Sequence, residues 1–191
     1  MEVTGIKIIK REFKNPLLRA YMDITLNNSL EVYGLKILQR YNNSQALVMP
    51  DLLDGKERVD VFHPVNAPTR KWLETIIFDV YKKCEKVEDE IILSENEPSL
   101  IGITSIRPFI TKNSPEIKDR VSIVLENQLT FFVRVRQKEN NNDIFYLDMP
   151  HIIKSSGQRE NIVCPLTPQM SEHLKTTVLA DEGVRRLILK K

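Results

Sequence analysis

Residues 24–30 read Ile-Thr-Leu-Asn-Asn-Ser-Leu, and residues 123–129 read Ile-Val-Leu-Glu-Asn-Gln-Leu. Other paired features surround these two stretches in the same order: Gly5-Ile6 with Gly102-Ile103, Met49-Pro50 with Met149-Pro150, and His63-Pro64 with Cys164-Pro165. Each pair alone is a weak signal, but their common order indicates an internal repeat. We therefore predict a tandem duplication, with copies at residues 1–84 and 99–191 and a linker at residues 85–98.

Each copy is expected to form strands followed by one helix, which is an α+β fold built on an antiparallel sheet. The expected strands are residues 3–11, 19–26, 31–40, 45–49 and 58–65 in the first copy, and 100–107, 120–125, 130–136, 144–149 and 161–164 in the second. The run Asn27-Asn28-Ser29 suits a tight hairpin turn. Pro50 and Pro64 fit strand ends, because a residue before proline is pushed towards extended geometry.

An amphipathic helix closes each copy. Asn66 is the expected N-cap of the first helix and Thr167 that of the second, with a proline in each opening turn. Residues that face the core recur at helical spacing, so each helix should cover one face of its sheet. The apolar stripe of the first helix is Trp72, Leu73, Ile76, Ile77, Val80 and Cys84, and the inner face of the second is lined by Met170, Leu174, Thr177 and Val178. Gly183 is expected to end the second helix, and residues 184–189 to form a further strand.

Composition places the chain among soluble globular proteins. It has 191 residues, of which 41% are hydrophobic and 28% charged. No apolar run approaches the roughly 18–20 residues of a membrane helix, and the first residues lack the pattern of a secretory signal. Cys84 and Cys164 are too few and too far apart for a disulfide framework or a zinc knuckle. Reduced thiols in the cytoplasm are the expectation.

Charge is distributed unevenly along the chain. Residues 1–84 hold 13 Lys and Arg against 10 Asp and Glu, and residues 99–191 hold 14 against 10. Residues 85–98 hold one Lys and six acidic residues. We interpret this acidic linker as a solvated tether, with shielding of a basic surface as the alternative. Two basic blocks permit nucleic-acid binding without establishing it.

The first copy resembles the SpoVG septation-protein family. The features that carry the resemblance are Ile24-Thr25-Leu26, Met49-Pro50, Gly55 to Arg58, His63-Pro64-Val65-Asn66, Thr69-Arg70 and the closing helix. They cover nearly all of residues 1–84. Residues 99–191 resemble the family more faintly, and mostly through the first copy. There the Thr-Arg pair at the helix start is missing, and no basic residue occurs in the helix before Lys175.

The resemblance implies a small antiparallel α+β unit that normally dimerises. It also implies a bacterial cytoplasmic regulator of septation, cell division and sporulation that binds DNA and also RNA. Because this chain carries two copies, we expect them to pack on each other as an intramolecular pseudo-dimer. The chain would then be a monomer, with a homo-oligomer as the alternative.

The candidate nucleic-acid-binding residues lie mainly in the first copy. Arg70 and Lys71 lie in the first helical turn, where the helix N-terminus adds N–H donors and partial positive charge. Lys56 and Arg58 lie in the preceding glycine loop, and the resemblance implies binding through this loop and the helix start. The alternative is an ordinary solvated surface.

A second basic stripe is expected on a strand of the second copy. Arg134 and Arg136 alternate with Val133 and Val135, so the arginines face one side and the valines the core. This pattern is typical either of phosphate contacts or of the solvated face of a sheet. Arg134 and Arg136 are therefore auxiliary candidates.

Catalytic patterns are missing from the sequence. It has no phosphate-binding glycine loop, no H-E-x-x-H and no nucleophile elbow. His63 is interpreted as a hydrogen-bonded structural residue. We expect no enzyme activity, no cofactor and no metal site. Two function classes remain: a nucleic-acid-binding regulator, or a protein-interaction module of the division machinery whose basic residues only aid solubility.

Overall fold

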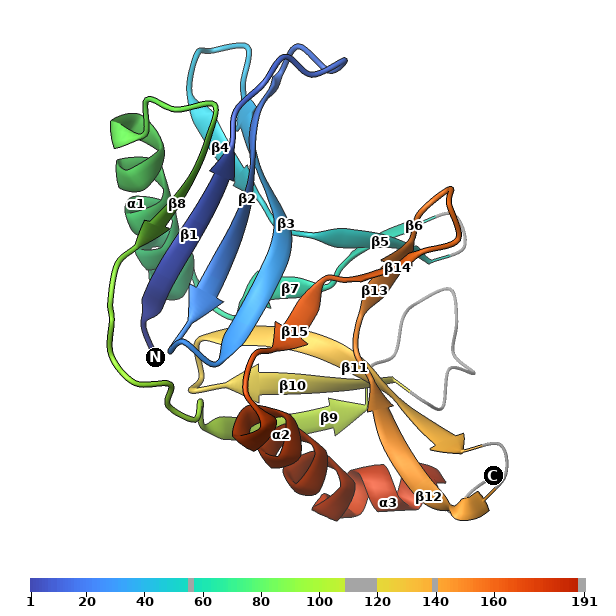
Figure 1. The fold of residues 1–191 in the computed structure, drawn as a ribbon. Coiled ribbons are helices and arrows are strands. Elements are labelled where there is room, and N and C mark those ends of the chain that lie inside the picture. Colours follow the sequence, from blue (N-terminus) through green and yellow to red (C-terminus); the bar gives the residue numbers. More distant parts are fainter. Residues whose placement is uncertain (55–56, 109–119, 139–140, 189–191) are drawn as a thin grey trace.

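The computed structural model describes residues 1–54, 57–108, 120–138 and 141–188 (Figure 1). Its strands are β1 (Val3–Ile9), β2 (Leu18–Leu26), β3 (Leu30–Gln39), β4 (Gln45–Val48), β5 (Asp51–Asp54), β6 (Glu57–Asp60), β7 (Phe62–Pro64), β8 (Glu88–Ile92), β9 (Ile103–Pro108), β10 (Arg120–Leu125), β11 (Leu129–Lys138), β12 (Asn141–Asp148), β13 (His151–Ile153), β14 (Arg159–Asn161) and β15 (Val163–Pro165). Its helices are α1 (Ala67–Lys83), α2 (Pro168–Ala180) and α3 (Glu182–Ile188). The α+β class with antiparallel sheets is as predicted.

The first sheet has the strand order β15-β3-β2-β1-β8, with β4 also paired to β3. Side chains alternate along β2, where Met22, Ile24 and Leu26 are at most 1% exposed. A period of two buries one face of a strand. The turn into β3 has positive φ at Asn27 (48°) and Asn28 (50°), as a primed hairpin turn requires. The predicted hairpin is therefore confirmed.

The second sheet has the strand order β12-β11-β10-β9, with β7 also paired to β11. The turn from β10 to β11 repeats the geometry of the first sheet's hairpin, with φ of 46° at Glu126 and 55° at Asn127. Ile123 and Leu125 on β10 pack with Phe131 on β11 in the core, each at most 1% exposed. The second sheet is thus organised around the same kind of tight hairpin.

Strands are exchanged between the two sheets. Strand β7, which precedes α1, pairs with β11 of the second sheet, and β15, which precedes α2, pairs with β3 of the first. The registers match, because Pro64 lies opposite Leu129 and Pro165 lies opposite Leu30. Figure 1 shows β7 and β15 where the two sheets meet. The two sheets are therefore joined by backbone hydrogen bonds in both directions.

The predicted caps of both long helices are present. The Asn66 side chain accepts a hydrogen bond from the Thr69 N–H at 2.8 Å, and the Thr167 hydroxyl accepts one from the Met170 N–H at 3.1 Å. The buried stripe of α1 includes Leu73, which is fully buried. A fully buried leucine contributes about 1.5–3 kcal/mol relative to an exposed one. The stripe therefore anchors α1 on the core.

The expected tether at residues 85–98 is wrong for part of its length. Residues 88–92 form β8, which pairs antiparallel with β1, and Lys7 Nζ lies 3.3 Å from a Glu88 carboxylate oxygen. Along β8 the less exposed side chains alternate with exposed ones, and Ile91 packs against the core. The high acidic content of the segment concealed this alternation.

The C-terminal expectations also need correction. Residues 182–188 form α3 rather than a strand, and Val184 on α3 is only 1% exposed. Gly183 lies inside α3, and α2 instead ends at Ala180. The Asp181 side chain accepts a hydrogen bond from the Val184 N–H at 3.0 Å, which is an N-cap for α3. Leu189 lies outside the described residues.

The strand expected at residues 58–65 is two strands, β6 and β7. They are separated at Val61, whose N–H donates to the Pro50 carbonyl at 2.8 Å. Strand β6 turns back to form a hairpin with β5, which the sequence analysis missed. The equivalent hairpin β13–β14 follows Pro150, and Ile162 donates to the Pro150 carbonyl at 2.7 Å. Of the candidate binding residues in the described part of the chain, Arg58 lies on the first of these hairpins.

Candidate nucleic-acid interface

Arg70 and Lys71, in the first turn of α1, differ in how far they are engaged. The Arg70 guanidinium donates to the Leu47 carbonyl at 3.0 Å and lies 3.1 Å from the Glu74 carboxylate. Arg70 therefore ties α1 to β4, although its side chain is still 47% exposed. Lys71 is exposed and has no ion-pair partner within the described part of the chain. Of this pair, Lys71 is the freer cation.

The hairpin β5–β6 carries Arg58, which forms an ion pair with Asp51. Lys36 Nζ lies 3.1 Å from the other oxygen of that carboxylate. Burial alone would raise the pKa of Asp51, but the hydrogen bonds from Arg58 and Lys36 outweigh it and hold the pKa below its ordinary value. Lys56 lies outside the described residues. The charge of Arg58 is thus partly neutralised within its own hairpin.

Arg134 and Arg136 alternate along β11 as predicted. Val133 is fully buried and Val135 is 5% exposed, while both arginines are half-buried on the other face. Asp148 lies directly across from Arg134 in the pairing with β12. The stripe on β11 therefore faces away from the core.

Asp148 gathers cations on this face. Its side chain is 8% exposed, and its two oxygens lie 3.3 Å from the Arg136 guanidinium and 2.7 Å from that of Arg159. His151 Nδ1 is 2.9 Å from the Met149 carbonyl and 3.6 Å from Asp148. Neither Arg159 nor Asp148 was predicted from the sequence as a residue of the site. The repeat offered a signal for Arg159, because it occupies the position in β14 that Arg58 occupies in β6.

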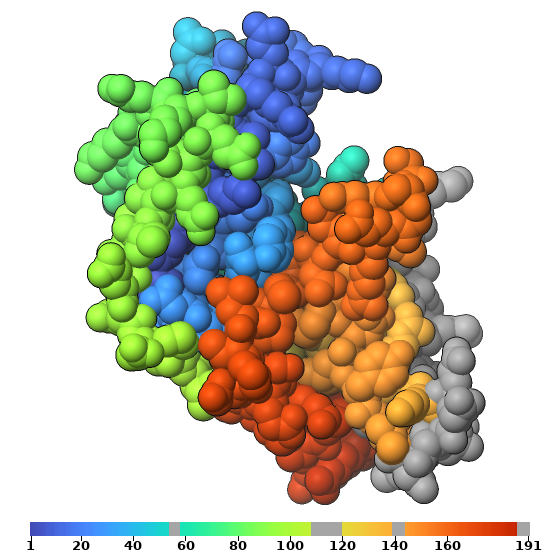
Figure 2. Space-filling view, in the orientation of Figure 1, coloured from blue at the N-terminus to red at the C-terminus, as the bar shows by residue number. Residues whose placement is uncertain are grey.

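A pocket of about 70 Å³ lies where the hairpin β5–β6 meets the second sheet. It is lined by Leu52 of β5 and by Phe132, Arg134, Asp148, Met149, Pro150 and His151. The hairpins β5–β6 and β13–β14 also lie close together on the surface (Figures 1 and 2). The structure thus brings the hairpin of Arg58 next to the strand that carries Arg134 and Arg136.

The structure does not join Arg70 to this group. Arg70 contacts Leu47 and Glu74, and among the described residues it shares no hydrogen-bond or ion-pair partner with Arg58, Arg134 or Arg136. The predicted residues therefore divide into two places, the start of α1 and the junction of the hairpins with β11.

The acidic residues of the segment 85–98 form their ion pairs away from the candidate binding residues. Glu88 pairs with Lys7, and Asp89 pairs with Lys86 at 3.0 Å. Strand β8 is the edge strand beside β1, at the other end of the sheet from β15. In the described structure none of its ion pairs involves a predicted binding residue.

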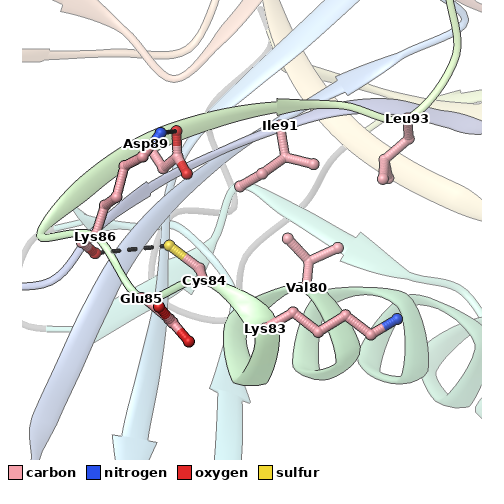
Figure 3. A pocket seen from close by; sticks show the side chains of 8 residues that line it. All are labelled: Val80, Lys83, Cys84, Glu85, Lys86, Asp89, Ile91 and Leu93. Atoms are coloured by element: carbon pink, nitrogen blue, oxygen red, sulfur yellow. Dashed lines mark hydrogen bonds and ion pairs between the residues drawn. The ribbon is translucent and has the colours of Figure 1, made fainter.

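A cavity of about 400 Å³ lies between the end of α1 and β8 (Figure 3). Val80, Ile91 and Leu93 form its apolar wall, and the remaining lining residues are Lys83, Cys84, Glu85, Lys86 and Asp89. The Cys84 thiol points to the Lys86 carbonyl at 3.6 Å. The cavity lining holds no histidine that could activate this thiol.

His63 is not hydrogen-bonded through Nδ1, contrary to the expectation. This atom is buried and has no hydrogen-bond partner among the described residues. Burial lowers the pKa of His63 below its ordinary value, and nearby Asp60 only partly opposes this. His63 lies opposite Thr130 in the β7–β11 pairing. His63 therefore lines the junction between the sheets as a neutral side chain.

No group of three or more His, Cys, Asp or Glu side chains in the described ranges is arranged to hold a metal ion. None of the described helices is both long and apolar enough to cross a lipid bilayer.

Comparison with known proteins places the first half in a family. The SpoVG family model matches residues 1–83. A septation protein SpoVG of Bdellovibrio bacteriovorus is 35% identical over 96 residues, which is 49% of this chain and 85% of that protein. The corresponding proteins of Acetivibrio thermocellus and Geobacillus thermodenitrificans are 32% and 31% identical, over 43% and 48% of this chain and 86% and 94% of their own lengths. This chain therefore belongs to the SpoVG family.

Proposed function

We propose that this protein is a non-enzymatic, cytoplasmic regulator connected with septation that acts by binding DNA or RNA. Relatives of the chain carry the name septation protein SpoVG, which supports the connection with septation. The observation that carries the binding proposal is the group of arginines at the junction of the hairpins with β11. Cations on one surface bind nucleic acid by neutralising phosphates.

The proposal includes an internal pseudo-dimer. The second half, residues 99–191, takes the place of a second subunit, and residues 85–98 connect the halves. The reciprocal pairing of β7 with β11 and of β15 with β3 supports this arrangement, because each half supplies an equivalent strand to the other. Such reciprocity is expected of a two-fold interface. As a result, the sequences of the two halves can diverge while the halves stay paired.

Binding across a salt series tests the function. Random-sequence duplex DNA and RNA are titrated by mobility shift, and log affinity is expected to fall linearly with log salt, by about 0.9 per neutralised duplex phosphate. The double variants Arg70→Ala/Lys71→Ala and Arg134→Ala/Arg136→Ala should each reduce the slope by up to about 2. A matched control is Lys82→Ala/Lys83→Ala in the last turn of α1, which should leave the slope unchanged.

A second candidate function is a protein-interaction module of the division machinery. Leu53 on β5 and Ile153 on β13 occupy equivalent hairpin positions and are 70% and 71% exposed. Exposed aliphatic side chains on a protruding hairpin are typical of a protein contact. A folded protein that binds neither nucleic acid at low salt would favour this candidate and contradict the first.

A further inference from the structure

The face of β11–β12 opposite the buried side chains of Val133 and Val135 combines an aromatic ring with arginines. Arg136 lies directly opposite Tyr146 in the strand pairing, and Arg134 lies opposite Asp148. Directly opposed residues of an antiparallel pair point to the same side of the sheet. The flanking residues Phe145 and Leu147 pack against the core, while Tyr146 is 45% exposed. Tyr146 and the arginines therefore share one outward face.

The positive charges on this face are held in place, and they outnumber the negative charge that holds them. Asp148 is the carboxylate that holds the guanidinium groups of Arg136 and Arg159, whose side chains are still 41% and 49% exposed. Each guanidinium has five N–H donors, so donors remain after the contact with Asp148. Arg134 has no hydrogen-bond or ion-pair partner among the described residues, and it borders the 70 Å³ pocket. Two arginines thus contact one carboxylate, and Arg134 lies opposite it in the strand pairing.

The first half lacks this combination. Directly before Met49-Pro50 the corresponding cross-strand pairs are Lys36 with Val48 and Leu38 with Ala46. In the second half the pairs before Met149-Pro150 are Arg134 with Asp148 and Arg136 with Tyr146. Leucine and alanine offer neither a flat ring for stacking nor a hydrogen-bond donor for a phosphate group. The feature therefore belongs to the divergence of the second half.

We propose that this face, composed of Arg134, Arg136 and Tyr146 and called here the Arg–Tyr platform, binds single-stranded nucleic acid. The Tyr146 ring stacks on one unpaired base, and Arg134 and Arg136 contact neighbouring phosphates. Aromatic side chains combined with a cationic surface bind single strands without strong sequence preference, because every base has a π face. In a duplex those faces are covered by neighbouring bases. The inference rests on the proposed function and narrows it from nucleic acid in general to single strands.

Fluorescence anisotropy with labelled oligo-dT and oligo-rU, and with a duplex of equal length, tests the platform. Tyr146→Ala should weaken single-strand binding by roughly 5- to 150-fold, the effect of losing one stacked base. The salt slope should stay unchanged in this variant, because stacking releases no counterions. Tyr146→Phe keeps the ring and should keep the affinity. Arg134→Ala should instead reduce the single-strand slope by about 0.7.

Tyr41→Ala is the matched control, because Tyr41 is 94% exposed in the loop between β3 and β4, away from the platform. It should bind as the unmodified protein does. Duplex binding with equal affinity, or a folded Tyr146→Ala variant that retains single-strand affinity, overturns the platform while the proposed function stands. Failure to bind any of the three probes overturns both proposals. Unchanged thermal unfolding of Tyr146→Ala confirms that a loss of binding is local.

Discussion

Replacing Phe62 by alanine tests whether the exchanged strands make the two halves unfold as one unit. Phe62 lies on β7, is fully buried, and lies opposite Phe131 of β11. Removing a buried phenyl ring costs about 3–5 kcal/mol. For a chain of this length about 1 kcal/mol corresponds to roughly 2–4 °C in the melting temperature. We therefore expect Phe62→Ala to melt roughly 6–20 °C lower.

Each half needs its own probe. Trp72 is the only tryptophan and lies on α1, so its fluorescence during urea unfolding reports on the first half. Hydrogen exchange of peptides from β10 and β11 reports on the second half. In Phe62→Ala both probes should lose the same free energy of unfolding. Phe13→Ala is the control, because this half-buried ring makes an edge contact with Tyr21 and a cation–π contact with Arg11, and its loss should cost about 1 kcal/mol.

One result would refute the reasoning. If Phe62→Ala shifts the Trp72 transition while exchange in β10 and β11 stays at its original level, the halves unfold separately. The β7–β11 pairing would then not couple them.

The remaining predictions concern mass, acid stability, a helix end and the thiols. Light scattering at micromolar concentration should give the mass of one chain, 22.2 kDa, and twice that mass would contradict complete internal pairing. Because the folded state lowers the pKa of Asp51, its ion pairs stabilise the fold above about pH 4 and are lost as the pH falls through the lowered value. Asp51→Asn should therefore destabilise the protein in urea at pH 7 and progressively less in acid. Lys10 donates to the carbonyls of Tyr81 and Cys84 at the end of α1 and lies 4.2 Å from the Tyr81 ring centre, so Lys10→Met should lower the free energy of unfolding by about 1–3 kcal/mol. Equal stability of the two proteins in urea would contradict that role. Cys84 is 8% exposed and Cys164 is half-buried, so a thiol reagent should label Cys164 first, and a fast phase that survives in Cys164→Ser would contradict this.

Features that depend on neighbouring residues could be predicted from the sequence. The Asn27-Asn28 turn needs positive φ, which asparagine tolerates, and both helix caps lie three residues from the N–H groups they bind. The alternation of Arg134 and Arg136 with buried valines follows from the period of a strand. Residues close in sequence determine these structures, so local sequence patterns were sufficient to predict them.

Features that depend on distant residues could not be predicted. Nothing in the sequence around Phe62 shows that β7 pairs with β11 rather than with its own sheet, because unpaired edges attract any complementary backbone. The burial of Asp148 between Arg136 and Arg159 likewise needs three strands placed together. The strand at Ile91 was hidden by its acidic neighbours, and α3 by β-branched and aliphatic residues that also suit a strand.

The exchanged strands also determine when the first sheet can be completed during synthesis of the chain. Strand β3 needs β15 as its neighbour, and Val163 of β15 lies opposite Val32 of β3. Val163 is made only after most of the chain has been translated. At about 5–20 residues per second, a ribosome takes on the order of 10 s to supply it. During that interval the nascent chain exposes unpaired N–H and C=O groups along Leu30–Val32, where other nascent chains or a chaperone can pair. Completion of the first sheet is therefore delayed until β15 has left the ribosome.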